Sequence, residues 1–464
     1  MRPAYHYAPA ANWLSDPNGL VFVDGEWHLF YQYNPHGDQW GHMAWGHAIS
    51  RDLVAWDERP PALLEDERHL IFSGSAVVDT ANSAGFGAGA LVAIYTGASQ
   101  QGGHQVQCLA ASNDGGRNWH KFDGNPVLDR DMADFRDPNV FWHEGTRRWI
   151  MVVALSNEDR ALVYASDDLK AWREVSAIGP FGLTGRVWEC PLLIELPVEG
   201  GEATRWLFKV DLLAGGPGSG AIALTGTFDG ERFAADRDAT GEVAVIEVDY
   251  GRDFYAAIAW HAPRDAAGRP CWIGWMGNHG YQASLPHRGW RGAMSVPRWI
   301  GLRVEGDRYR LVQSVEPAVA AAFVPMQRWS GIAIESRIPI ASRIGLVRHD
   351  PSQPVTVTLT DAASGRVTIA IGEGGIAIDR AAAVHGAFDA TVDTAAFDGA
   401  IDLWLDVATL EIASADGGTW ASLQHCLSGE MVTVRVECAA LVDVAVAAFV
   451  GEADLPARSI AGAR

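Results

Sequence analysis

The chain has 464 residues, of which 48% are hydrophobic and 20% are charged. This composition is typical of a globular protein, and the length exceeds what one hydrophobic core usually supports, which indicates two or three domains. The formal net charge is −21, with 57 acidic against 36 basic residues and no cluster of Lys and Arg. These features argue against nucleic acid and anionic membranes as partners.

The cysteines and the N-terminal segment bear on the cellular compartment of the protein. The cysteines are odd in number, scattered along the sequence and without a CxxC pair, which argues against a disulfide framework or a zinc site. We expect reduced thiols at Cys108, Cys190, Cys271, Cys426 and Cys438. No apolar run resembles a signal peptide, and no stretch approaches the ~20 apolar residues of a transmembrane helix. A cytoplasmic protein is therefore expected, or a secreted one if a leader has been removed.

Repeated hairpins are predicted along the first 300 residues. The segment 16–18 (DPN) precedes an apolar run, an Asp-Gly turn and a second apolar run, and 137–139 (DPN) precedes the same arrangement with a Glu-Gly turn. Similar hairpins are predicted to begin near 73, 189 and 253. These alternating runs separated by turn residues are typical of paired β-strands.

A second repeated phrase is a polar turn followed by an aromatic residue, as expected between two strands. It occurs at 50–53 (SRDL), 112–115 (SNDG), 166–169 (SDDL) and, more weakly, 227–230 (TFDG). Five strand-rich units of ~50–60 residues indicate a five-bladed β-propeller, because one blade cannot bury both faces of its sheet. The first strand of each blade lines the axis, so polar residues at the strand starts converge in one funnel.

The repeat stops after 297–298 (PR). We expect a linker over 311–329, which includes a short connecting helix, and then short alternating strands such as 355–359, 367–371, 403–405 and 432–436. These strands, with their Gly and Asp turns, predict a β-sandwich. The expected organisation is all-β, with a propeller over 1–310 and a C-terminal sandwich over 330–464.

Asp16, Asp137 and Glu189 each stand at the start of a predicted innermost strand. An isolated Asp-Pro-Asn is usually a turn whose carboxylate caps the backbone, but three acidic residues in one ring are expected to share a pocket. Their repulsion favours one carboxyl that keeps its proton, and such a pair of acid and carboxylate cleaves glycosides. Metal binding is the competing explanation. The aromatic surroundings argue against it.

Three segments resemble the signatures of glycoside hydrolase family 32, which contains invertases, exo-inulinases and levanases. They are 12–19 (NWLSDPNG), 135–138 (FRDP) and 188–191 (WECP). The resemblance extends over nearly the whole chain and includes the segments 31–35, 45–48, 72–79, 253–257 and 405–417. It implies a five-bladed propeller followed by a sandwich, and retention of configuration at the fructosyl carbon.

The resemblance also implies roles for individual residues. Asp16 would be the nucleophile, Glu189 the general acid/base, and Asp137 the residue that grips fructose hydroxyls at the transition state. Nine further residues would line or support the fructose pocket: Ser15, Gln32, Trp40, Phe72, Ser73, Arg136, Cys190, Tyr255 and His279. For Trp40, Phe72 and Tyr255 the alternative is packing in the core.

Two positions depart from the family pattern. Ser15 stands where the family usually has Asn, and His279 stands where it usually has Trp. The resemblance implies that position 15 bears on the choice between water and a sugar as acceptor, and that position 279 forms a wall of the pocket. Because of these two departures, the sequence leaves both hydrolysis and fructosyl transfer as outcomes.

The expected function is release of terminal, non-reducing β-D-fructofuranosyl units from sucrose, fructo-oligosaccharides or fructans such as levan and inulin. One alternative is a fructosyltransferase that uses the same covalent fructosyl-enzyme. Another is a non-catalytic sugar-binding protein, against which the presence of all three carboxylates argues. A small carbohydrate is the expected partner, and neither a metal nor an organic cofactor is expected. The sequence does not indicate the oligomeric state.

Overall fold

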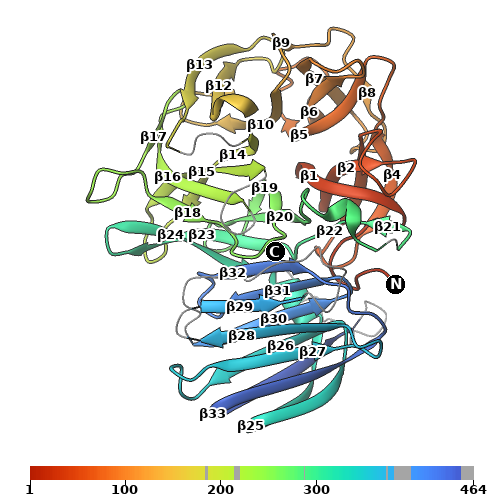
Figure 1. Ribbon diagram of the computed structural model, residues 1–464. Coiled ribbons are helices and arrows are strands. Elements are labelled where there is room, and N and C mark those ends of the chain that lie inside the picture. Colours follow the sequence, from red (N-terminus) through yellow and green to blue (C-terminus); the bar gives the residue numbers. More distant parts are fainter. Residues whose placement is uncertain (183–186, 214–219, 287, 373–374, 381–398, 451–464) are drawn as a thin grey trace.

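The computed structural model describes residues 1–182, 187–213, 220–286, 288–372, 375–380 and 399–450. Nearly all of its regular structure is β-strand, and the strands form a five-bladed propeller joined to a C-terminal sandwich (Figure 1). The expected fold class is confirmed. Among the described residues, no helix is long and apolar enough to cross a membrane.

Each blade is an antiparallel sheet. Blade 1 contains β1 (Asn12–Val23), β2 (Glu26–Asn34), β3 (Ala44–Ser50) and β4 (Asp57–Leu63). Blade 2 contains β5 (His69–Asp79), β6 (Ala90–Ser99), β7 (Gln105–Ser112), β8 (His120–Lys121) and β9 (Leu128–Met132). Blade 3 contains β10 (Phe135–His143), β11 (Arg148–Leu155), β12 (Arg160–Ser166) and β13 (Arg173–Ile178), with the short helix η1 (Ser156–Glu158) between β11 and β12.

The last two blades continue this order. Blade 4 contains β14 (Val187–Pro197), β15 (Thr204–Leu213), β16 (Ala221–Phe228), β17 (Phe233–Ala235) and β18 (Val245–Glu247). Blade 5 contains β19 (Tyr255–Arg264), β20 (Pro270–Met276), β22 (Ala293–Met294), β23 (Arg298–Glu305) and β24 (Arg308–Val315). The short helix η2 (Gln282–Ser284) follows β20. Strand β21 (Trp290–Arg291) pairs with β1 and thereby links the end of the propeller to its first blade.

The first strands of the blades form the inner ring. Strands β1, β5, β10, β14 and β19 each contact the next around the circle, and β19 contacts β1. The two Asp-Pro-Asn hairpins occupy equivalent places, since Phe22 pairs with Trp27 and Trp142 pairs with Trp149. The prediction that the strand starts meet around one axis is therefore confirmed.

The polar turn phrases connect the third and fourth strands of blades 1 to 4. In the turn between β3 and β4, the Ser50 hydroxyl accepts the Leu53 N–H at 2.8 Å, and the Asp52 carboxylate accepts the Ala55 N–H at 2.9 Å. The phrases that begin at 112, 166 and 227 fall at the corresponding turns of blades 2, 3 and 4. Each phrase therefore marks where a blade turns toward its outer edge.

Hydrophobic clusters lie between neighbouring blades. Phe30 and Trp45 of blade 1 pack with Ile71 of blade 2, and similar clusters join blades 2 and 3, 3 and 4, and 4 and 5. A further cluster joins blade 5 to blade 1 through residues such as Trp13 and Trp275. Burial of apolar surface is the main stabilising contribution to such contacts, so closure of the ring stabilises every blade.

The C-terminal strands form one nine-stranded sheet that contains β25 (Phe323–Pro339), β26 (Ser342–Arg348), β27 (Val355–Thr360), β28 (Arg366–Gly372), β29 (Gly375–Asp379), β30 (Ala400–Asp406), β31 (Thr409–Ser414), β32 (Trp420–Gln424) and β33 (Met431–Phe449). Buried and outward-facing residues alternate along β27 and β28, and the buried side chains share one core. The predicted range 330–464 includes 373–374, 381–398 and 451–464, which lie outside the described residues.

The segment between the two domains is short. The range expected as a linker, 311–329, holds the end of β24, the helix α1 (Pro317–Ala321) and the start of β25. A proline begins α1, and the carboxylate of Glu316 accepts the Ala318 N–H at 3.1 Å, which caps the helix. The expected connecting helix is therefore confirmed.

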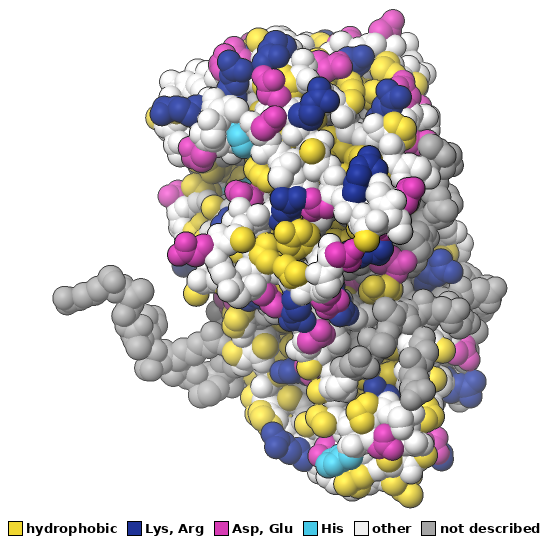
Figure 2. Space-filling view, turned by 90° about the vertical axis from the view of Figure 1, so that its left-hand side faces the viewer, with side chains coloured by type: hydrophobic (Ala, Val, Ile, Leu, Met, Phe, Trp, Pro, Cys, Tyr) yellow, Lys and Arg dark blue, Asp and Glu magenta, His cyan; other side chains and the backbone are white. Residues whose placement is uncertain are grey.

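Charges and cysteines agree with the bulk composition. On the side of the molecule shown in Figure 2, acidic and basic side chains are interspersed rather than gathered into one large patch. All five cysteines are free, and four of them are buried.

Candidate active site

The inner strand of every blade has an irregular register near its start. The interruptions fall between Leu14 and Pro17, between Ile71 and Gly74, and at the corresponding places of β10, β14 and β19. An extra residue in a strand bends it and re-aims the neighbouring side chains, and such bulges recur beside active sites. These bulges place the predicted site residues at one end of the funnel.

One pocket of about 260 Å³ gathers ten of the twelve predicted residues. It is lined by Ser15, Asp16, Gln32, Trp40, Phe72, Ser73, Arg136, Asp137, Glu189 and His279. The remaining two, Cys190 and Tyr255, are buried and bond to the carboxylates of the lining. The structure therefore brings all twelve residues to a single site.

The two carboxylate oxygens of Asp16 differ in their hydrogen bonding among the described residues. Its Oδ2 accepts the Ser73 hydroxyl at 2.7 Å and lies 3.7 Å from Cys190 Sγ. Its buried Oδ1 has no hydrogen-bond partner among the described residues. A buried, unpartnered acceptor is costly unless a ligand or water meets it. One oxygen of the carboxylate is therefore oriented by hydrogen bonding, and the other has no protein partner among the described residues.

The asparagine of the Asp-Pro-Asn motif joins blade 1 to blade 2. Asn18 Oδ1 accepts the N–H of Gly74 at 3.0 Å, so β1 and β5 are tied just beside the pocket. A side chain at Gly74 is excluded, because a Cβ there would lie 2.1 Å from the carbonyl oxygen of Ile94. The backbone-capping role is filled by the asparagine of Asp-Pro-Asn, which leaves the carboxylate for the pocket.

Glu189 is held on both of its oxygens. Oε1 accepts Arg136 Nε at 3.2 Å, and Arg136 Nη2 lies 3.1 Å from the same oxygen. Oε2 accepts the hydroxyl of Tyr255 at 2.7 Å. Arg136 is itself positioned by Asp134 at 3.0 Å. The Glu189 carboxyl is thus fixed in orientation.

Asp137 is the most enclosed of the three carboxyls. Its Oδ2 accepts the Cys190 N–H at 3.0 Å, and Cys190 Sγ lies 3.7 Å from the same oxygen. Burial raises the pKa of Asp137 to about 7; Arg136 opposes this shift, while the negative charges of Glu189 and Asp16 add to it. This agrees with the expectation that one carboxyl of the set retains a proton.

Cys190 stands between two of the carboxylates. Burial raises the pKa of its thiol well above the usual value, and the charges of Asp137 and Asp16 add to the shift. The sulfur is therefore a neutral S–H and a weak donor to the two oxygens at 3.7 Å. Both Cys190 and Asp137 have left-handed backbone, with φ of 47° and 64°. Such strained conformations cluster at functional sites.

Known proteins share this sequence and architecture. The family model "Glycosyl hydrolases family 32 N-terminal domain" matches residues 6–314. The chain belongs to glycosyl hydrolase family 32. A levanase of Bacillus subtilis is 46% identical over 341 residues, which cover 72% of this chain and 49% of the levanase. The family 32 chain therefore spans about half the length of that relative.

Two solved structures resemble the family 32 chain along nearly its whole length. The exo-inulinase of Aspergillus awamori has a TM-score of 0.88 at 31% identity, covering 97% of this chain and 98% of that one. The fructofuranosidase of Schwanniomyces occidentalis, complexed with fructose, has a TM-score of 0.84 at 27% identity and covers 96% of this chain and 97% of that one. Both likenesses include the propeller and the sandwich.

The two departures from the family pattern lie at the pocket. Ser15 is buried beside Asp16. The His279 ring lies 4.8 Å from the Trp275 ring and 5.5 Å from the Tyr255 ring, centroid to centroid. Because Tyr255 donates to Glu189, His279 packs on a residue that orients this carboxyl. Trp40 is 52% exposed and lies edge-on to Phe72 at 6.0 Å, so core packing does not account for it.

A buried ion pair behind the pocket was not predicted. Lys209 and Asp211 are fully buried and bond to each other, and Lys209 Nζ also donates to the backbone oxygens of Cys190 at 3.3 Å and Ala257 at 3.0 Å. Two charged residues inside the apolar run of β15 are the signal that could have found them. The pair braces the bulges of β14 and β19 from behind.

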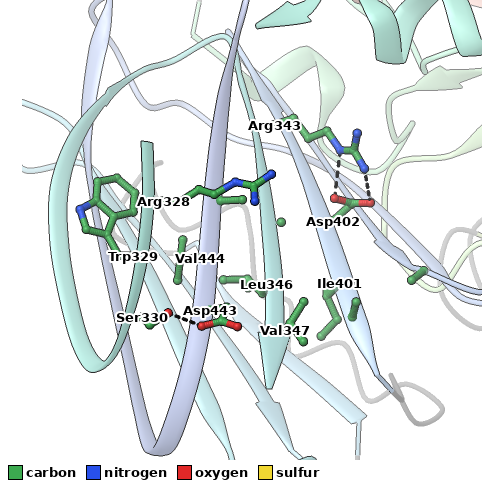
Figure 3. A pocket seen from close by; sticks show the side chains of 14 residues that line it. Arg328, Trp329, Ser330, Arg343, Leu346, Val347, Ile401, Asp402, Asp443 and Val444 are labelled. Carbon is green, nitrogen blue, oxygen red and sulfur yellow. Dashed lines mark hydrogen bonds and ion pairs between the residues drawn. The ribbon is translucent and has the colours of Figure 1, made fainter. Parts of the chain in front are cut away.

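A wider hollow of about 680 Å³ lies on the sandwich (Figure 3). Its acidic side chains are engaged: Asp402 accepts Arg343 at 3.0 and 2.8 Å, and Asp443 accepts the Ser330 hydroxyl. The propeller pocket, in contrast, holds three carboxyls with one free oxygen at Asp16. The propeller pocket is therefore the candidate active site.

Proposed function

We propose that this family 32 chain is a retaining β-fructosidase that removes a terminal fructosyl unit. The observation that carries the proposal is the contrast between two carboxyls of one pocket. Asp16 has a free oxygen, whereas Glu189 is held on both oxygens. An acid that is fixed in orientation and a second carboxylate in the same pocket suit a double-displacement glycosidase.

In the first step, the Asp16 carboxylate attacks the anomeric carbon while Glu189 gives its proton to the departing glycosidic oxygen. The bond from the carbon to that oxygen breaks as the ester bond to Asp16 forms. In the second step, Glu189 takes a proton from water, whose oxygen displaces Asp16 and releases fructose. Ser73 stabilises the Asp16 carboxylate through the 2.7 Å hydrogen bond to Oδ2.

The pocket size favours a terminal sugar. Its volume of about 260 Å³ lies below the roughly 300–1,000 Å³ of typical ligand pockets, which suits one sugar unit. The relatives are named levanase and exo-inulinase, so terminal units of β-linked fructans are the proposed substrates, together with sucrose and short fructo-oligosaccharides. Product analysis after incubation with sucrose, inulin and levan tests this proposal, since release of fructose alone from a polymer shows exo action.

The stereochemical course gives a separate expected result. Two displacements return the original configuration, so NMR should detect the β-anomer of fructose first. A first-formed α-anomer would exclude Asp16 as a covalent nucleophile. In retaining glycosidases the two catalytic carboxyl groups lie roughly 5–5.5 Å apart, and this is the spacing we expect between Asp16 and Glu189.

The pH profile should fall on the alkaline side. The raised pKa of Asp137, about 7, means that this carboxyl is protonated below that pH and ionised above it. Above that pH Asp137 can no longer donate a hydrogen bond to a sugar hydroxyl in the transition state. We expect kcat/KM to decline above about pH 7. A profile that is flat between about pH 6 and pH 9 would contradict these roles.

Fructosyl transfer is a second candidate outcome, favoured by Ser15 and His279. Both residues line the pocket, so they can alter which acceptor is well placed to attack the fructosyl-enzyme. At high sucrose we expect oligosaccharide products in addition to fructose, and we expect the double variant Ser15→Asn, His279→Trp to change the ratio of transfer to hydrolysis about two- to tenfold. Equal ratios in a folded variant would show that the two substitutions are neutral.

A further inference from the structure

Three side chains with metal-ligand chemistry lie together near the mouth of the pocket. His36 and His42 belong to the loop between β2 and β3, and Glu65 belongs to the loop between β4 and β5. One ligand atom from each lies within 4.8 Å of the others. His42 Nδ1 is 2.6 Å from Glu65 Oε1, and the rings of His36 and His42 are 5.2 Å apart at 87°. We call these three residues the rim cluster.

The ligand types favour one class of ion. Two imidazoles and one carboxylate suit zinc and its divalent transition-metal neighbours, whereas calcium and magnesium prefer all-oxygen sets. Zinc sites with three protein ligands leave a fourth position for water. Bonds of about 2.0–2.2 Å place tetrahedral ligand atoms roughly 3.3 Å apart. The ligand atoms of the rim cluster lie within 4.8 Å of one another, and the side chains of His36 and His42 are exposed, so both rings have room to rotate toward that spacing.

The backbone that carries the histidines is already held. Asn34 Oδ1 accepts the His36 N–H at 2.8 Å, and Asn34 Nδ2 donates to the Gln39 carbonyl at 2.8 Å. The Gly37 carbonyl accepts the Trp13 N–H at 3.0 Å. These bonds fix the loop from His36 to Gln39, so an ion need not order a free chain there. Such preorganisation lowers the cost of binding.

Glu65 has the outer support expected of a ligating carboxylate. Its Oε2 accepts Gln100 Nε2 at 2.8 Å, which leaves Oε1 directed at His42. Hydrogen bonds of this kind orient metal ligands and raise affinity. An ordinary surface ion pair is the competing explanation, and His104 with Asp129, 2.8 Å apart, is one. Among the described residues, however, only the rim cluster brings a third such side chain within reach.

We propose that His36, His42 and Glu65 bind one zinc-class divalent ion, and that this ion fixes Trp40 at the mouth of the pocket. Trp40 lies between the two histidines in the sequence, lines the pocket and contacts Phe72. The ion replaces the contact between His42 and Glu65 and joins the two loops. The effect on Trp40 rests on the proposed function, whereas metal binding itself does not.

Binding is tested on untagged protein stripped with a chelator. Titration with Co²⁺, followed by visible absorption and by competition with Zn²⁺, should show one equivalent bound. His36→Ala and His42→Ala should each weaken binding at least tenfold. His104→Ala is the matched control, because it removes a histidine paired with only one carboxylate, and it should bind as the unaltered chain does. Glu65→Gln, which keeps the size of the side chain, should also weaken binding.

Three results would each overturn the site: absence of cobalt binding, an equal loss of cobalt affinity in His104→Ala, or undiminished binding in the folded His36→Ala and His42→Ala variants.

The second measurement compares KM for a fructo-oligosaccharide with and without Zn²⁺. We expect KM to be about two- to tenfold lower with the ion, the range for fixing one side chain in advance, and we expect Trp40→Ala to abolish this response. Metal binding without any change in KM would overturn the effect on Trp40. A chain that binds the ion but cleaves no fructoside would refute the proposed function alone.

Discussion

Asp16→Asn and Glu189→Gln are each expected to reduce kcat by at least ~10²–10⁴-fold while the protein stays folded. An asparagine amide at position 16 would be a poor nucleophile, and a glutamine amide at position 189 could not supply a proton. Both changes preserve side-chain size, and the hydrogen bonds of Ser73 and Tyr255 can still find an oxygen. Steady-state kinetics with sucrose, together with thermal unfolding, measure the two effects separately.

Surface variants of the same chemistry provide the control. Asp114→Asn alters an exposed turn of blade 2, and Glu174→Gln alters an exposed ion pair between Glu174 of blade 3 and Arg130 of blade 2. Neither should change kcat, since both residues lie outside the pocket lining. Near-normal turnover in Asp16→Asn or Glu189→Gln would refute the assignment, and so would equal losses in the surface variants.

The covalent intermediate can be sought directly. In Glu189→Gln the second displacement lacks its base, so a substrate with a good leaving group should label Asp16 with one fructosyl unit faster than water removes it. Peptide mass analysis locates the label. A label on another carboxyl, or no label despite product release, would contradict the role of Asp16.

Much of the fold was predictable because a propeller repeats its local pattern. The hairpins after Asp16 and Asp137 and the polar turns after Ser50 and Ser166 mark strands and connections at equivalent places. Local periodicity and turn residues report such features directly. Closure of the repeat into a ring then places the strand starts together, which is why three carboxyls separated by up to 173 residues could be assigned to one pocket.

The details that orient those carboxyls were not predictable in this way. A bulge inserts a residue and changes which side of the strand a side chain faces. The pattern of apolar and polar residues around Asp137 and Cys190 does not indicate a bulge at either place. Contacts between separate loops are equally hidden. The rim cluster joins Glu65 to His36 and His42, and Lys209 supports Cys190 from another strand. Such contacts depend on how the blades are placed, which local sequence does not specify.

A buried arginine between the two domains should matter most for stability. Arg298 Nη1 donates to Asp249 at 3.2 Å, and Nη2 donates to Glu411 and, at 2.7 Å, to Ser422. The guanidinium carbon also lies 3.9 Å above the Trp420 ring. Asp249 and Arg298 come from the propeller, whereas the other three residues come from the sandwich. One side chain therefore joins two buried acids across the interface.

Arg298→Met is expected to lower the free energy of unfolding by about 3–5 kcal/mol, because it leaves two buried acids without their cation. Burial alone would raise the pKa of Glu411, yet the net shift is downward because Arg298 and His6 stabilise the carboxylate. Without Arg298, the partners of Glu411 among the described residues are reduced to His6 and the Val296 N–H. Chemical unfolding followed by fluorescence and by circular dichroism measures the loss and shows whether the domains still unfold together.

A second arginine at the same interface is the matched control. Arg303 also bridges the domains, binding Glu199 at 2.7 Å and Asp416 at 3.0 Å, but all three side chains are partly exposed. Exposed pairs contribute little, so Arg303→Met should cost less than about 1 kcal/mol. Adding Asp249→Asn to Arg298→Met should recover part of the larger loss, since it removes one of the stranded charges. If both arginine variants lose the same stability, burial of the charges is not what makes Arg298 important.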